Sequence, residues 1–130
     1  MKVRWSHEPE PHDYSAAAAY LSLLTDPATA AALAGALAQQ PVVFHKAKDI
    51  LRAARLPLLP PDDPYVKADL KRVRKGKKLS PILLVRGNLD GTPLRIADGY
   101  HRVCASYHLS EDTDVSAQII TVPPQSTRHP

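Results

Sequence analysis

Five consecutive residues, Asp98-Gly99-Tyr100-His101-Arg102, combine groups that bind anions with groups that move protons. Apolar residues before them predict a strand, and those after them predict a helix, so the five form a strand-to-helix turn. The first backbone N–H groups of a helix lack partners within it, and a glycine lets a ligand approach them closely. An arginine adds a planar donor that suits phosphate. The turn therefore predicts a phosphate-binding site.

Each side chain of this turn has a functional and a structural interpretation. Asp98 could act as a base, hold Mg²⁺ beside a bound phosphate, or simply cap the helix. His101 could donate to phosphate or carry a proton, or it could hydrogen-bond across the turn. Arg102 could contact phosphate, or pair with Asp98 or Asp69. The predicted catalytic residues are Asp98 and His101, and the predicted phosphate contacts are Gly99, Tyr100, His101 and Arg102.

The positive charge of the chain is concentrated in its middle. The net charge of the sequence is +4, whereas residues 46–78 hold eleven lysines and arginines against four aspartates, a net charge of +7. Such a segment attracts nucleotides or the nucleic-acid backbone, and it is equally typical of a solvated helix face. The candidate nucleic-acid contacts are Lys67, Lys71, Arg72, Arg74, Lys75, Lys77 and Lys78. A second wall of the anion site could be formed by His45, Lys46 and Ser80.

Capping residues predict the helices that surround the turn. Ser15 predicts the start of a helix over 16–24, and Asp26-Pro27 predicts a second helix over 27–39. Together they form a helical hairpin. The same pattern at Asp63-Pro64 begins a helix that Gly76 ends. Periodicity predicts further helices over 46–55 and 100–109.

Short apolar runs predict the strands, at 42–44, 82–85, 94–96 and 115–122. The run Ile82-Leu83-Leu84-Val85 is apolar enough to be buried on both faces. Asp90-Gly91 predicts a hairpin turn after it. We expect one α/β domain with a small mixed sheet flanked by helices. Its predicted parts are an extended or mobile lead-in (1–13), the hairpin (14–40), the core (41–122) and a flexible tail (123–130).

Composition argues against several other classes of protein. No segment has the ~20 apolar residues of a membrane span, and the N-terminus lacks the apolar core of a signal peptide, so we expect a cytoplasmic protein that makes no membrane contact. The single cysteine, Cys104, is expected to be a buried thiol. His7 and His12 are not expected to bind metal, and His108 is expected to be partly buried. Glycine-rich nucleotide loops of known type are missing.

The order of these elements resembles the ParB/sulfiredoxin superfamily. A basic helix ending in glycine leads to Leu79-Ser80-Pro81-Ile82-Leu83-Leu84-Val85, and a hairpin then leads to Ile96-Ala97-Asp98-Gly99-Tyr100-His101-Arg102. The likeness covers residues 46–122. Members bind nucleotide phosphates at this turn, and they include a CTP-dependent DNA clamp, ATP-using sulfiredoxins and an ADP-dependent serine kinase. The resemblance therefore implies phosphate contacts at residues 99–102, with an acidic residue at 98 as in the kinase-like members.

Two differences between this sequence and the superfamily limit which of its activities we expect here. Sulfiredoxins carry their catalytic cysteine at the position of Tyr100, and Cys104 lies a helical turn further on, so a sulfiredoxin activity is not expected. A full-length ParB adds a DNA-reading domain for which the chain has no room. We therefore expect a domain that binds ATP, ADP or CTP with Mg²⁺, as a nucleotide hydrolase or phosphotransferase. The alternative is a non-catalytic module that binds nucleic acid or protein through residues 46–78, with a homodimer as one form.

Overall fold

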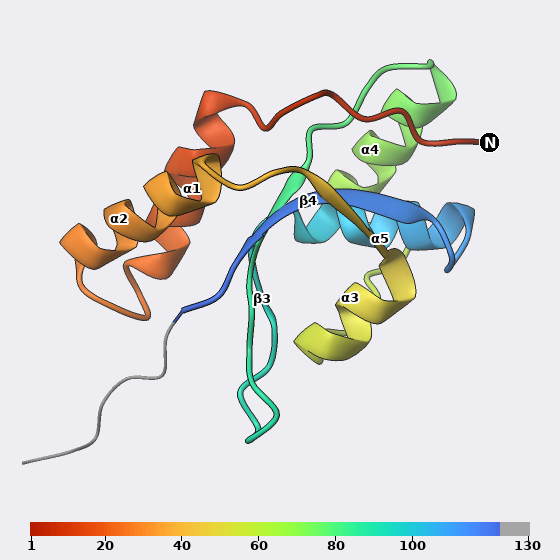
Figure 1. Cartoon of the computed structure of the whole chain (residues 1–130). Helices are drawn as coiled ribbons and strands as arrows, with labels where there is room; N and C mark the ends of the chain where they lie inside the picture. The colour runs from red at the N-terminus through yellow and green to blue at the C-terminus, as the bar shows by residue number, and fades with distance from the viewer. Residues whose placement is uncertain (123–130) are drawn as a thin grey trace, which may run out of the picture.

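The computed structural model describes residues 1–122 and contains nine elements in that part of the chain (Figure 1). These elements are, in order, α1 (Pro11–Leu21), α2 (Pro27–Ala38), β1 (Val43–Lys46), α3 (Ala47–Ala54), α4 (Pro64–Arg74), β2 (Ile82–Val85), β3 (Arg95–Asp98), α5 (Tyr100–Leu109) and β4 (Asp114–Ile120). The predicted α/β class is confirmed. The predicted tail, 123–130, lies outside the described residues.

The four strands form one mixed sheet in the order β1-β4-β2-β3. The two central strands, β2 and β4, run parallel, with Leu84 opposite Ile119. Each outer strand is antiparallel to its neighbour. A short hairpin connection suffices for β2 and β3, whereas the parallel pair needs a crossover, which α5 supplies. The pairing therefore brings the end of β3 and the start of α5 beside the beginning of the central strand β2, with Asp98 opposite Leu83.

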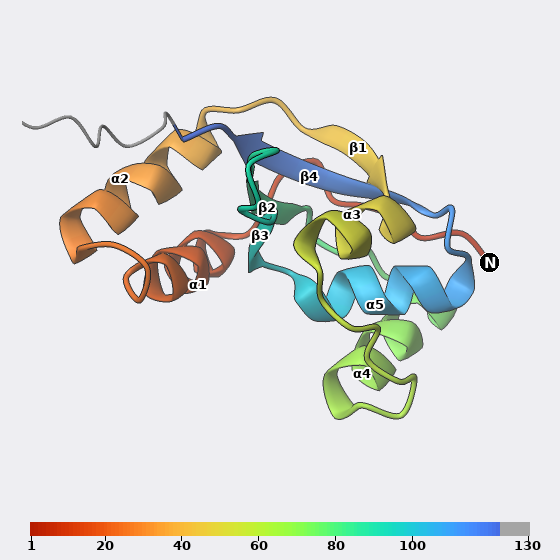
Figure 2. The ribbon, with the colours of Figure 1, turned by 90° about the horizontal axis from the view of Figure 1, so that it is seen from below.

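Strand β2 is buried on both faces, as its apolar sequence predicts. Ile82 and Leu84 pack in a cluster with α3, α4 and α5. Leu83 and Val85 point the other way and pack against the α1–α2 hairpin. Figure 2 shows the hairpin on one side of the sheet, with α3 and α5 on the other. Because helices cover both faces of the sheet at β2, a strand made only of apolar residues is stable at this position.

The first helix begins earlier than predicted. Helix α1 starts at Pro11 with Glu10 as N-cap, five residues before the helix that Ser15 was expected to begin. The Asp13 carboxylate accepts a hydrogen bond from the Glu10 amide at 2.8 Å, which satisfies one free N–H at the helix start. Proline at the first helical position completes this start signal. Helix α2 begins at Pro27 with the Asp26 side chain accepting from the Thr29 amide, as predicted.

The N-terminal segment, which is predicted to be extended or mobile, is attached to the core and passes into α1 at Pro11. The Ser6 amide donates to the Leu79 carbonyl, and the Leu79 amide donates to the Arg4 carbonyl. The indole of Trp5 donates to the Asp114 carbonyl, and Val3 is buried. These contacts carry the chain across the sheet and deliver the start of α1 to the β3–α5 turn. No helix in the described part of the chain is long and apolar enough to cross a membrane.

Gly99 is a position where the fold depends directly on a glycine. Its φ is +108°, a conformation that other residues adopt only with strain, and an added Cβ would lie 2.7 Å from the Cβ of Ile82. We predict that Gly99→Ala lowers the free energy of unfolding by about 3 kcal/mol or more, from backbone strain and overpacking together. Urea unfolding followed by circular dichroism measures the change.

Gly35 offers the matched control. It lies within α2, and a Cβ there would meet nothing within 4 Å. Gly35→Ala should raise the unfolding free energy by roughly 0.5–1 kcal/mol, because alanine is the better helix former. Equal effects of the two substitutions would contradict the account of Gly99.

Candidate functional site

The strand-to-helix turn has the predicted position but a different cap. Asp98 is the last residue of β3, and the N-cap of α5 is Gly99, which has no side chain to accept a hydrogen bond. The prediction that Asp98 caps the helix is therefore wrong. Its carboxylate turns instead toward Arg102, one helical turn ahead, at 2.5 Å. The structural alternative that paired these two residues is the one observed.

The missing cap leaves the first amides of α5 available. The first hydrogen bond within the helix runs from the Val103 amide to the Gly99 carbonyl at 3.1 Å. The amides of Tyr100, His101 and Arg102 precede it, and the geometry of a helix gives them no acceptor within α5. The positive end of the helix dipole lies at the same place. An anion placed here would meet unpaired donors and a favourable field.

Arg102 links four segments of the chain. Its Nη1 donates to the Ser80 carbonyl at 2.8 Å and also contacts the Ser80 hydroxyl. Its Nη2 donates to Asp98 and lies 3.6 Å from the Asp13 carboxylate. The three charged side chains are largely buried, with 12% of Arg102 exposed, 18% of Asp98 and 5% of Asp13. Arg102 therefore joins α1, β3, α5 and the segment before β2.

The carboxylates of Asp13 and Asp98 share the Arg102 guanidinium, and their pKa values shift in opposite directions. Burial, together with the adjacent Asp13 carboxylate, raises the pKa of Asp98 to about 6 against the opposing pull of Arg102. Burial also raises the pKa of Asp13, but the Glu10 amide and Arg102 outweigh that effect, so its net pKa is lowered. Of the pair, Asp98 thus holds a proton to the higher pH, close to the range where a general base works.

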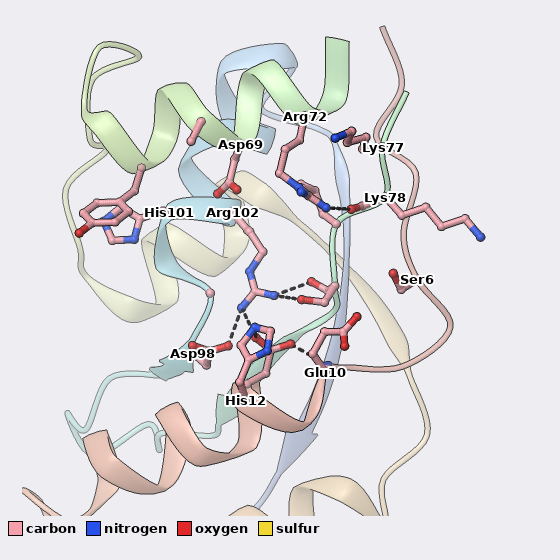
Figure 3. Close-up of a pocket in the computed structure, with 16 residues that line it drawn as sticks. Ser6, Glu10, His12, Asp69, Arg72, Lys77, Lys78, Asp98, His101 and Arg102 are labelled. Atoms are coloured by element: carbon pink, nitrogen blue, oxygen red, sulfur yellow. Dashed lines mark hydrogen bonds and ion pairs between the residues drawn. The ribbon is translucent and has the colours of Figure 1, made fainter. Parts of the chain in front are cut away.

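A cleft of about 840 Å³ opens above this cluster. One wall is the N-terminus of α1 and the other is α4, with the α5 start and residues 77–80 between them (Figure 3). His101 lies at one end of the cleft in this view, Lys77 and Lys78 lie at the other, and Arg102 lies between them. The cleft is large enough for a ligand of drug-like size.

The cleft carries both signs of charge in equal number, before its histidines are counted. The acids are Glu10, Asp13, Asp69 and Asp98, and the permanent cations are Arg72, Lys77, Lys78 and Arg102. Burial raises the pKa of Asp69, although Arg102, His101 and Arg72 oppose the change. Cations that attract an anion stand beside carboxylates able to accept a proton. This combination suits a reaction at a phosphate more than simple anion capture.

Some predicted site residues lie outside the cleft. The side chain of Tyr100 turns away, and its hydroxyl donates to the Pro57 carbonyl at 2.5 Å. His45 and Lys46 belong to β1, and His45 lines a different pocket, between α3 and the β2–β3 connection. The idea that His45 and Lys46 form a second wall is therefore wrong. Ser80 does line the cleft, where it holds Arg102.

The basic segment divides between the cleft and the outer surface. Arg72, Lys77 and Lys78 line the cleft. The remaining candidate contacts for nucleic acid are exposed residues of α4 and its end that do not line it, namely Lys67, Lys71, Arg74 and Lys75. The apolar stripe of α4, formed by Val66, Leu70 and Val73, faces the core.

The sequence analysis missed the contribution of α1 to the site. His12 and Asp13 fell in the segment interpreted as an extended or mobile lead-in, yet both line the cleft. The available signal was Glu10-Pro11-His12-Asp13, in which proline at the first helical position is followed by a carboxylate in the first turn. Glutamate is an uncommon N-cap, so a preference-based search passes it over in favour of Ser15.

The other reactive side chains are structural. Cys104 is fully buried, and burial raises the pKa of its thiol, as suits a core residue and not a nucleophile. A ring nitrogen of His108 lies 2.7 Å from the Leu59 carbonyl in a partly buried position. Among residues 1–122, no group of three or more histidine, cysteine or acidic side chains is arranged to hold a metal ion. The carboxylate of Asp98, the predicted Mg²⁺ ligand, already pairs with Arg102.

Comparisons with protein-family models, with curated proteins and with solved structures gave no match to this chain. The resemblance to the ParB/sulfiredoxin superfamily therefore stays a prediction.

The carboxylate pair makes a prediction about acidity. In Asp13→Asn the negative charge beside Asp98 is lost, while an oxygen remains to accept from the Glu10 amide. The pKa of Asp98 should fall from about 6 by about one unit, a typical effect of removing one neighbouring charge. A ¹³C NMR titration of the Asp98 carboxyl measures it. Glu8→Gln, at an exposed position outside the cleft, is the control, and an unchanged Asp98 titration in Asp13→Asn would contradict the coupling.

The raised pKa of Asp98 also predicts how stability depends on pH. Between about pH 4 and pH 6 the folded protein keeps a proton at Asp98 that the unfolded chain has released, and Asp69 acts in the same direction. The free energy of unfolding should therefore fall as the pH rises through this window. Urea unfolding at pH 4, 5, 6 and 7 tests the slope. A steady rise across the window would contradict the assignment.

Proposed function

We propose that this cleft binds the phosphate groups of a nucleotide and catalyses their transfer or hydrolysis. The observation that carries the proposal is the start of α5, whose first amides have no acceptor within the helix and whose residues Gly99, His101 and Arg102 line a cleft that also holds Arg72, Lys77 and Lys78. Backbone donors, a helix dipole and cationic side chains together are a common means of binding phosphate. The resemblance of residues 46–122 to ParB-like domains points to the same turn.

Different groups in the cleft would contact different parts of the bound phosphates. The amides of residues 100–102 and the side chain of His101 would contact phosphate oxygens, and Lys77 and Lys78 would neutralise the outer phosphates. Arg102 would contribute its charge from a fixed place, because its donors already serve Ser80, Asp98 and Asp13. Its principal role is thus to position Asp98.

Asp98 is proposed as the general base. With a pKa of about 6 it is mainly ionised at pH 7 and still basic enough to accept a proton. The oxygen of an acceptor hydroxyl would form the new bond to phosphorus, its proton would pass to Asp98, and the bond to the leaving phosphate would break. His101 would protonate or hold the leaving oxygen. Water takes the place of the acceptor in hydrolysis.

A panel of nucleotides tests the proposal. Thermal unfolding is followed with ATP, ADP, CTP and GTP, each with and without Mg²⁺. At least one nucleotide should raise the Tm of the wild-type protein. The double variant Lys77→Ala/Lys78→Ala should bind it at least tenfold more weakly, because a charge-assisted contact contributes about 1.5–3 kcal/mol. These exposed lysines are better targets than Arg102, whose loss would leave two buried carboxylates without their partner.

The matched control is Lys71→Ala/Lys75→Ala, which removes the same charge from exposed positions outside the cleft. This control should bind nucleotide as the wild type does at ordinary salt. If no nucleotide raises the Tm, or if both double variants lose binding equally, the assignment of the cleft is wrong.

The exposed cations of α4 favour a second candidate function, the binding of a nucleic-acid backbone. Lys67, Lys71, Arg74 and Lys75 stand outside the cleft, next to Lys77 and Lys78 in the sequence. This alternative predicts binding to DNA or RNA that weakens steeply with salt and is reduced by Lys71→Ala/Lys75→Ala. Fluorescence anisotropy with a labelled oligonucleotide, over a range of salt concentrations, separates the two functions.

A further inference from the structure

Two aromatic rings meet at the end of the cleft opposite Lys77 and Lys78. The centroids of the Tyr65 and His101 rings lie 4.9 Å apart, with an angle of 44° between their planes. Both residues line the cleft, and 68% of Tyr65 is exposed. The phenol ring is therefore held against another cleft residue and not against the core.

The backbone of Tyr65 is firmly placed although its ring is exposed. The Asp63 carboxylate accepts from the amides of Tyr65 and Val66 at 3.0 and 3.1 Å, which caps α4. Pro64 fixes the first helical residue, and Val66 is fully buried beside Tyr65. An aromatic face held at a fixed place beside a polar cleft is a preorganised surface for another flat ring.

The two ends of the cleft differ in chemistry. Lys77 and Lys78, which suit phosphate, lie at one end, and His101, whose ring packs against that of Tyr65, lies at the other, with Arg102 between them (Figure 3). A volume of about 840 Å³ leaves room for more than a chain of phosphates. A ligand that matches this arrangement has an anionic end and a flat aromatic end.

We propose that the exposed ring of Tyr65, held in place by its packing against His101, forms a stacking platform for the base of the bound nucleotide, so that the substrates are nucleoside phosphates and not inorganic polyphosphates or sugar phosphates. This inference rests on the proposed function. Stacking on an aromatic ring tolerates every base, because each has a flat π face. The platform therefore selects for the presence of a base and discriminates only modestly between bases.

The experiment compares two ligands that share the phosphates. Isothermal titration calorimetry measures ATP and inorganic triphosphate binding to the wild type, Tyr65→Phe and Tyr65→Ala. The wild type should bind ATP more tightly than triphosphate. Tyr65→Ala should weaken ATP binding by about tenfold, the order expected for one stacked base, and leave triphosphate binding unchanged. Tyr65→Phe keeps the ring and should retain both affinities.

Phe44→Ala is the matched control, since Phe44 is an exposed aromatic residue of β1 outside the cleft, and it should change neither affinity. If Tyr65→Ala weakens both ligands equally, or weakens neither, the platform is refuted while the phosphate site stands. The platform is also refuted, while the phosphate site stands, if the wild type binds triphosphate as tightly as ATP. If the wild type binds neither ligand, the proposed function itself fails.

Discussion

The buried ion cluster around Arg102 is the interaction on which the rest of the structure depends. One guanidinium holds Asp98 at the end of β3, Asp13 of α1 and the carbonyl of Ser80 before β2. It also lies on the first turn of α5. Elements distant in the sequence are thus brought to one point, and a buried charge of this kind is tolerated only when its donors are satisfied. The same cluster fixes the floor of the cleft.

The chemistry of the cleft follows from that constraint. Since two carboxylates compete for one cation, burial and repulsion keep a proton on Asp98 to a higher pH than an ordinary aspartate would hold it. Arg102 is committed to holding this pair, so the groups left to meet a ligand are the α5 amides, His101 and the lysines at the rim. Structural and chemical roles are thereby separated: the buried cation positions the base, and the outer cations attract the ligand.

Local signals in the sequence predict much of this fold. Asp-Pro caps locate α2 and α4, the apolar run of β2 indicates a strand covered on both faces, and Gly99 marks the turn before α5. A search for preferred capping residues misses the start of α1, because its N-cap, Glu10, is an uncommon one. The place of Asp13 in the site is a matter of long-range packing, which no local pattern encodes. The position of His45, on the strand at the opposite edge of the sheet from β3, depends likewise on strand order.

Phosphate binding at the uncapped start of α5 would change the NMR signals of the backbone amides there. Two-dimensional ¹H–¹⁵N NMR of the whole chain, titrated with inorganic pyrophosphate, reports each backbone N–H separately. We expect the largest chemical-shift changes at the amides of Tyr100, His101 and Arg102, with smaller changes at Lys77 and Lys78. Saturable shifts centred elsewhere, or the absence of any saturable shift at these three amides, would contradict this expectation.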